Sequence, residues 1–88
     1  MPKYCIVGPL GPEAMDFGLV EGESPLLALR NLHHECTSGC SMRNCQLVFA
    51  DARDQELCAG VWRVVECGRN SAASENRFLI PGSSRAAA

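Results

Sequence analysis

The sequence is poor in lysine. Lys3 is the only one in 88 residues, and eight basic residues face ten acidic ones. A nucleic-acid-binding domain usually carries a basic stripe or patch that tracks phosphates. Here the seven arginines are scattered along the chain and the formal net charge is −2. We therefore expect no nucleic-acid partner.

Long hydrophobic runs are also missing. No apolar stretch approaches the roughly 20 residues that span a bilayer. The first apolar run, residues 4–7, stops at Gly8 and Pro9 and is too short for the hydrophobic part of a signal peptide. We expect no membrane partner and a cytoplasmic location. Cysteines stay reduced there, so the six cysteines are expected to be free thiols that behave mostly as small apolar side chains.

Recognisable catalytic motifs are absent as well. The sequence has no nucleophile elbow and no local signature of a cysteine hydrolase. Residues 8–11 (Gly-Pro-Leu-Gly) do not suit phosphate binding, because Pro9 lacks an N–H and no helix follows directly. Asp51, Asp54 and Glu56 are expected in a solvated turn, where acid–base chemistry is not favoured. We expect a non-enzymatic protein without a cofactor.

What the sequence does contain is a normal globular share of apolar residues, 47%. A chain of this length has room for one core. We expect a single α+β domain over residues 1–81. Residues 82–88 (Gly-Ser-Ser-Arg-Ala-Ala-Ala) have no periodicity, so we expect a disordered or vector-derived tail there.

The first half of the chain predicts two strands and a helix. Residues 3–7 are rich in β-formers, and residues 16–21 resume extension after a Gly/Pro turn, with Phe17 and Leu19 on one face. The two runs predict a hairpin. Ser24 is a good N-cap, and Pro25 suits the first helical position. Helical spacing continues to residue 36, and Gly39 is expected in a left-handed cap.

The second half predicts a second hairpin. Residues 45–51 and 56–67 are interpreted as its strands, residues 52–55 as a polar turn, and Gly60 as a bulge. A polar connector over residues 68–76 precedes a short fifth strand at 77–80. The predicted fold is a small antiparallel sheet in strand-strand-helix-strand-strand order, with one helix packed on one face.

One cluster could carry metal or thiol chemistry. His33, Cys36, Cys40 and Cys45 follow one another closely, and thiolates and imidazoles are zinc ligands. Structural zinc sites usually pair two Cys-x2-Cys-like knuckles, and a second knuckle is missing here. We therefore expect Cys36 and Cys45 to be structural, no bound metal, and both histidines of the helix end, His33 and His34, to be solvated.

The strand patterns predict self-association. Both faces of residues 57–65 and of residues 47–50 are apolar, whereas one helix covers only one face of a sheet. Monomers rarely leave such a patch open. We expect a homodimer that hides the other face, with Trp62, Val64, Val48 and Val20 in the interface.

The function we infer from the sequence is that of a small non-enzymatic binding or interaction protein, acting as a homodimer or with another protein partner. One alternative is a metal- or thiol-dependent protein that uses the His33/Cys36/Cys40/Cys45 cluster. The other is a small-molecule-binding protein that uses the second sheet face.

Overall fold

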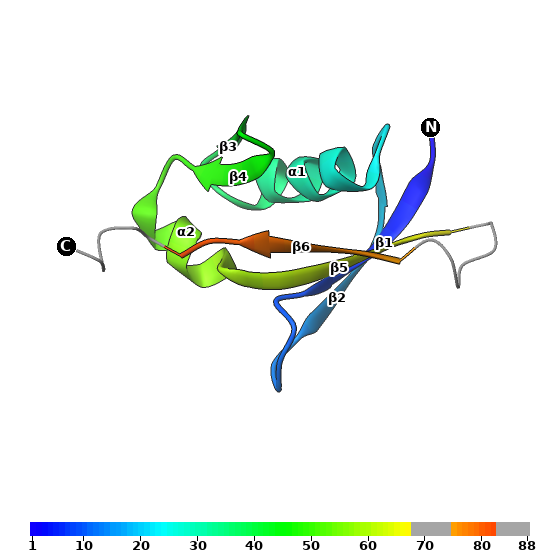
Figure 1. Cartoon of the computed structure of the whole chain (residues 1–88), viewed down its shortest axis with the longest axis horizontal. Helices are drawn as coiled ribbons and strands as arrows, with labels where there is room; N and C mark the ends of the chain where they lie inside the picture. The colour runs from blue at the N-terminus through cyan, green and yellow to red at the C-terminus, as the bar shows by residue number, and fades with distance from the viewer. Residues whose placement is uncertain (68–74, 83–88) are drawn as a thin grey trace.

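The computed structural model describes residues 1–67 and 75–82, and confirms the predicted α+β class (Figure 1). Four strands form an antiparallel sheet in the order β2-β1-β5-β6. A second sheet consists of the β3-β4 hairpin. The elements, in chain order, are β1 (Lys3–Gly8), β2 (Met15–Glu21), α1 (Pro25–Cys36), β3 (Cys40–Arg43), β4 (Gln46–Phe49), α2 (Ala52–Cys58), β5 (Gly60–Glu66) and β6 (Glu75–Ile80).

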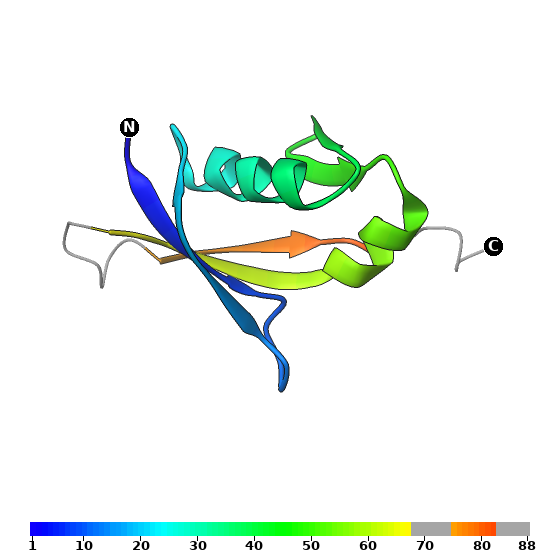
Figure 2. The same ribbon diagram turned by 180° about the vertical axis from the view of Figure 1, so that it is seen from behind.

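The elements form two layers. Helix α1 and the β3-β4 hairpin lie on one side of the four-stranded sheet, and α2 lies near one end of it (Figures 1 and 2). We call the side under α1 the inner face and the opposite side the outer face. Among the described residues, no helix is long and apolar enough to cross a membrane.

The first hairpin forms as predicted, but its second strand contains an irregularity. Leu19 pairs with Cys5 and Asp16 with Val7, so three steps along β2 match two along β1. The extra residue lies at Gly18, whose φ of +76° suits glycine. As a result, Phe17 lies on the inner side, where its ring centroid is 5.5 Å from that of Trp62. Leu19, which pairs with Cys5, lies on the outer side. The prediction that Phe17 and Leu19 share a face is wrong.

Helix α1 begins as the sequence predicts. The Ser24 Oγ accepts a hydrogen bond from the backbone N–H of Leu27 at 3.2 Å, and Pro25 occupies the first turn. The end of the helix differs from the prediction. The C-cap is Thr37 in an extended conformation, its N–H donating to the His33 carbonyl. Gly39, with φ of +135°, lies outside the left-handed helical region and does not cap the helix.

The core lies between the inner face and α1. It contains ten buried apolar residues: Tyr4, Ile6, Ala28, Leu29, Leu32, Leu47, Phe49, Trp62, Val64 and Ile80. The indole N–H of Trp62 donates to the Cys58 carbonyl at 2.9 Å, which satisfies its polar atom. Gly8 allows the indole to approach β1, because a Cβ at this position would lie 2.5 Å from the ring.

The second predicted hairpin is wrong. Strand β4 pairs with β3, a segment for which no strand was predicted, and β5 pairs with β1 and β6. The predicted polar turn at 52–55 is the start of α2, with Asp51 as its N-cap accepting from the Arg53 N–H. The predicted strand 56–67 is therefore part helix and part strand, and Gly60 begins β5 instead of forming a bulge within it.

The last predicted strand is present as β6, two residues longer at its start than expected. It pairs along its full length with β5, from Gly60–Ile80 to Val65–Glu75. Most of the predicted connector and the predicted tail lie outside the described residues.

Candidate functional site

The outer face of the four-stranded sheet is the most distinctive surface of the molecule. Strand register places on it the side chains that alternate with the buried Tyr4, Ile6, Trp62 and Val64. Its apolar members are Cys5 and Val7 of β1, Leu19 of β2, Val61 and Val65 of β5, and Leu79 of β6. Both helices and the second sheet lie away from this face (Figure 2).

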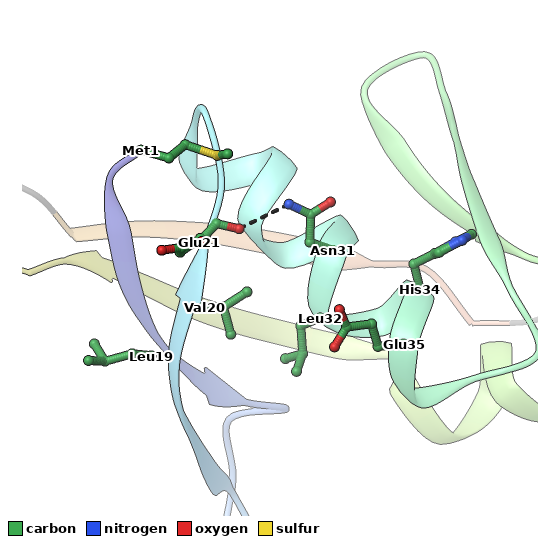
Figure 3. A pocket seen from close by; sticks show the side chains of 8 residues that line it. All are labelled: Met1, Leu19, Val20, Glu21, Asn31, Leu32, His34 and Glu35. Carbon is green, nitrogen blue, oxygen red and sulfur yellow. Dashed lines mark hydrogen bonds between the residues drawn. The ribbon is translucent and has the colours of Figure 1, made fainter.

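Two leucines on the outer face are largely exposed to solvent. Leu19 is 59% exposed and Leu79 is 62% exposed. Figure 3 shows Leu19 pointing away from α1, whereas its neighbour Val20 points towards Leu32 of the helix. These leucines lie on the two edge strands, Leu19 in the row of Cys5 and Val65, and Leu79 beside Val61.

A row of charged side chains crosses the outer face. Asp16 of β2 pairs with Val7 of β1, Val7 with Arg63 of β5, and Arg63 with Arg77 of β6. The row therefore begins with a carboxylate on one edge and ends with two neighbouring arginines near the other. Like charges directly opposite across strands repel one another.

The two arginines of this row differ in their partners. The Arg77 Nε donates to the Glu75 carboxylate at 2.9 Å in an exposed ion pair. The Arg63 Nε is buried and has no hydrogen-bond partner among the described residues. A buried guanidinium N–H without an acceptor is unfavourable. The outer face therefore holds a cationic group that could still gain a hydrogen bond.

The interface residues predicted from sequence lie elsewhere. Trp62 and Val64 are 2% and 0% exposed, because they are on the inner face beneath α1. Val20 packs against the core from β2, and Val48 is half-buried on β4 in the second sheet. The chain's own helix covers the face assigned to a second copy, so the interface prediction is corrected for Trp62 and Val64. Among the described residues, neither helix nor the second sheet covers the outer face.

The predicted Cys/His cluster is only partly brought together. Burial raises the pKa of the Cys58 thiol, and Asp54, Cys36 and Cys40 raise it further. Cys45 is exposed in the β3-β4 turn, with φ of +62°, and His33 is buried in the core. Within residues 1–67 and 75–82, no three His, Cys, Asp or Glu side chains form a group that could hold a metal ion.

His33 is a core residue, and its predicted solvation is wrong. It is 3% exposed and lies edge-on against the rings of Trp62 and Phe49. Its Nε2 has no hydrogen-bond partner among the described residues. Burial lowers the pKa of His33 to about 4, so the ring is neutral at physiological pH. His34 is exposed, as predicted.

A shallow groove of about 410 Å³ lies between β2 and α1 (Figure 3). Its lining residues are Met1, Leu19, Val20, Glu21, Asn31, Leu32, His34 and Glu35. The Asn31 Nδ2 donates to the backbone carbonyl of Glu21 at 2.9 Å and ties the helix to the strand. The lining contains two carboxylates and no lysine or arginine, which favours a cationic or uncharged ligand over an anionic one.

A pair of thiols that the sequence does not predict also lies on this sheet. Cys5 of β1 and Cys67, which follows β5, lie on the outer face with their Sγ atoms 2.8 Å apart. They are 62 positions apart in sequence, so local spacing gives no signal of their contact. Only the correct pairing of β1 with β5 would have revealed it.

Comparison with known proteins adds no relative to this description. The chain matches no family model, no curated protein and no solved structure.

Proposed function

We propose that the chain is a small non-enzymatic interaction protein that acts as a homodimer, in which two copies pack through the outer face of the four-stranded sheet. The observation that carries the proposal is the exposure of Leu19 and Leu79 on a face whose other apolar members are half-buried. Burying such a surface contributes about 25 cal/mol per Å² of apolar area. Exposed apolar side chains gathered on one face are typical of a protein–protein contact.

Charge complementarity favours a second copy as the occupant. A two-fold axis parallel to the strands, between β1 and β5, would place β2 of one copy over β6 of the other. The charged row of one copy then lies over the same row of the other copy in reverse order, with Asp16 over Arg77 and Val7 over Arg63. Such an interface is isologous, as in most homodimers.

Sheet geometry allows the contact between Asp16 of one copy and Arg77 of the other. Packed sheets cross at about −30°, which shifts the rows by about 4 Å at the edge strands. An arginine side chain can span that offset. The acquired carboxylate would also offset the repulsion between Arg63 and Arg77.

Light scattering at micromolar concentration tests the proposal. We expect twice the mass of the chain, and we expect Leu79→Asp to raise the dissociation constant at least about tenfold, because it places a charge in the contact. Leu57→Asp is the matched control, since Leu57 is 71% exposed on α2, outside the sheet. A wild-type monomer at about 100 µM, or equal effects of both variants, would overturn the proposal.

A second candidate function is the binding of a small cationic or uncharged ligand in the groove between β2 and α1. Its volume of about 410 Å³ lies in the range of ligand sites, and its lining combines apolar side chains with a few polar ones. Titration with small amines, followed by the amide NMR signals of Val20, Asn31 and Leu32, would test it. Unchanged signals at millimolar ligand would exclude amines as the class.

A further inference from the structure

Cys5 and Cys67 are held in contact by the backbone of the main sheet. Cys5 pairs with Val65 of β5, and the Cys67 N–H donates to the Lys3 carbonyl at 2.9 Å. Both thiols lie on the same face of neighbouring strands, with Sγ atoms 2.8 Å apart. Because the strand ladder sets this separation, the two sulfurs remain neighbours whenever the sheet is formed.

The contact between the two sulfurs affects the ionisation of Cys5. The hydrogen bond with the Cys67 thiol, followed by burial, raises the pKa of Cys5 to about 11. Cys5 therefore remains a protonated thiol at neutral pH and is a poor first nucleophile. Cys67 lies beyond the last residue of β5, so it is on the outermost row of the sheet. This arrangement gives Cys67 the role of the attacking thiol and Cys5 that of the resolving thiol.

We propose that Cys5 and Cys67 form a redox-active dithiol that low-molecular-weight disulfides of the glutathione class oxidise to an intramolecular disulfide. Cys67 loses its proton, and its thiolate attacks one sulfur of glutathione disulfide, breaking that S–S bond and releasing one glutathione. Cys5 then loses its proton and attacks the Cys67 sulfur of the mixed disulfide, which releases the second glutathione. Two protein thiols lose two electrons, and two glutathione thiols take up the electrons and the two protons.

The disulfide would link strands that are distant in sequence. It would close a loop of about 62 residues between β1 and the end of β5. A cross-link over a loop of this length constrains the unfolded chain, so the oxidised form should be more resistant to unfolding. Because both thiols lie on the outer face, packing of two copies through that face would limit the access of glutathione disulfide, so the reaction is run at a concentration where the chain is monomeric.

Non-reducing peptide mapping of the full chain tests the proposal. The protein is incubated with glutathione disulfide, the remaining thiols are alkylated, and trypsin is added. Cleavage after arginine and lysine places Cys5 alone in peptide 4–30 and Cys67 alone in peptide 64–69, with the other four cysteines elsewhere. We expect these two peptides to be linked, with the protein two hydrogen masses lighter.

Single variants separate the two roles. Cys5→Ser should stop the reaction at a glutathione adduct on Cys67, whereas Cys45→Ser, at an exposed turn position, should leave the linkage unchanged. The melting temperature should rise by at least about 5 °C on oxidation of the wild type and not of Cys67→Ser. Linkage of other cysteine peptides instead, or glutathione adducts on the wild type without a 4–30 to 64–69 link, would overturn the proposal. The reaction is followed in the monomer, so failure of the dimer would leave this result unaffected.

Discussion

The imidazole of His33 lies edge-on against the indole of Trp62, with ring centroids 4.4 Å apart and planes at 87°. This contact joins the last turn of α1 to the centre of the sheet, since Trp62 is on β5. T-shaped pairs of this kind stabilise a core beyond simple area burial. The contact shows which face of β5 the helix covers, and it makes a titratable ring part of the core.

Acid should destabilise the fold through His33. Its pKa is about 4 in the folded protein and 6.5 when unfolded, so between these values the unfolded chain binds a proton that the folded chain does not. The free energy of unfolding should therefore keep its highest value above about pH 6.5 and decrease as the pH drops towards 4. We expect a loss of at most about 3 kcal/mol, measured by urea unfolding across this range.

Histidine variants identify the source of this loss. His34→Gln, at the exposed neighbouring position, should keep the pH dependence, and His33→Leu should flatten it even if its overall stability changes. The same slope in the His33 variant would show that other groups cause it.

Substitutions on the two faces of β5 and β6 should have opposite consequences. Trp62→Ala should lower the free energy of unfolding by about 3–5 kcal/mol, because it empties a buried site and removes the hydrogen bond to Cys58. Leu79→Ala should change it by less than about 0.5 kcal/mol at concentrations where the chain is monomeric, because Leu79 is 62% exposed. Urea midpoints at low protein concentration measure both. A small loss of unfolding free energy in Trp62→Ala would mean that the inner face is not the core.

The sequence allowed the first half of the fold to be predicted because its signals are local. Ser24 and Pro25 mark a helix start through capping chemistry, and the Gly/Pro run separates two β-rich segments. The orientation of β5 has no such signal. Both of its faces are apolar, so alternation alone could not decide whether Trp62 faces the helix or solvent. The sequence therefore predicted an uncovered sheet face but assigned Trp62 and Val64 to it, although both are buried, and the role of that face in association stays a prediction.

Helix α2 was missed although a signal was present. Asp51 is a good N-cap, and the residues after it, Ala-Arg-Asp-Gln-Glu-Leu, are mostly good helix formers. Its polar first residues indicate a turn, and the β-rich segment that follows led us to predict a strand from residue 56 onwards. The contact of Cys5 with Cys67 and the row from Asp16 to Arg77 depend on strand order, which no local pattern encodes.

Both helix N-caps should contribute measurably to stability. Ser24→Ala should cost about 0.5–2 kcal/mol, because it removes the acceptor for the Leu27 N–H. Asp51→Ala should have a similar effect through the Arg53 N–H at the start of α2. Ser41→Ala, at an exposed position of β3, is the control and should be nearly neutral. Urea midpoints unchanged by Ser24→Ala would show that the helix does not begin there.

Charge reversal across the outer face should test the two-fold arrangement directly. In the proposed dimer Asp16 of each copy faces Arg77 of the other, so one interface contains the pair twice. Asp16→Arg alone, or Arg77→Asp alone, sets like charges opposite each other and should raise the dissociation constant by roughly 5- to 30-fold, since two surface pairs are worth about 1–2 kcal/mol together. Combining both substitutions restores opposite charges, and the double variant should dimerise more tightly than either single one.

The same experiment separates charge from local structure. The Asp16 Oδ1 also accepts a hydrogen bond from the Gly18 N–H at 2.8 Å, which shapes the irregular part of β2. Asp16→Asn keeps an acceptor there without the charge, so it should weaken the dimer only slightly. If the role of Asp16 were purely structural, Arg77→Asp would not restore the dimer in the Asp16→Arg variant. Salt should weaken the wild-type dimer and affect Asp16→Asn less, because screening acts on the charged pair. Additive effects of the two reversals, measured by light scattering or sedimentation, would mean that Asp16 and Arg77 do not meet across a two-fold axis.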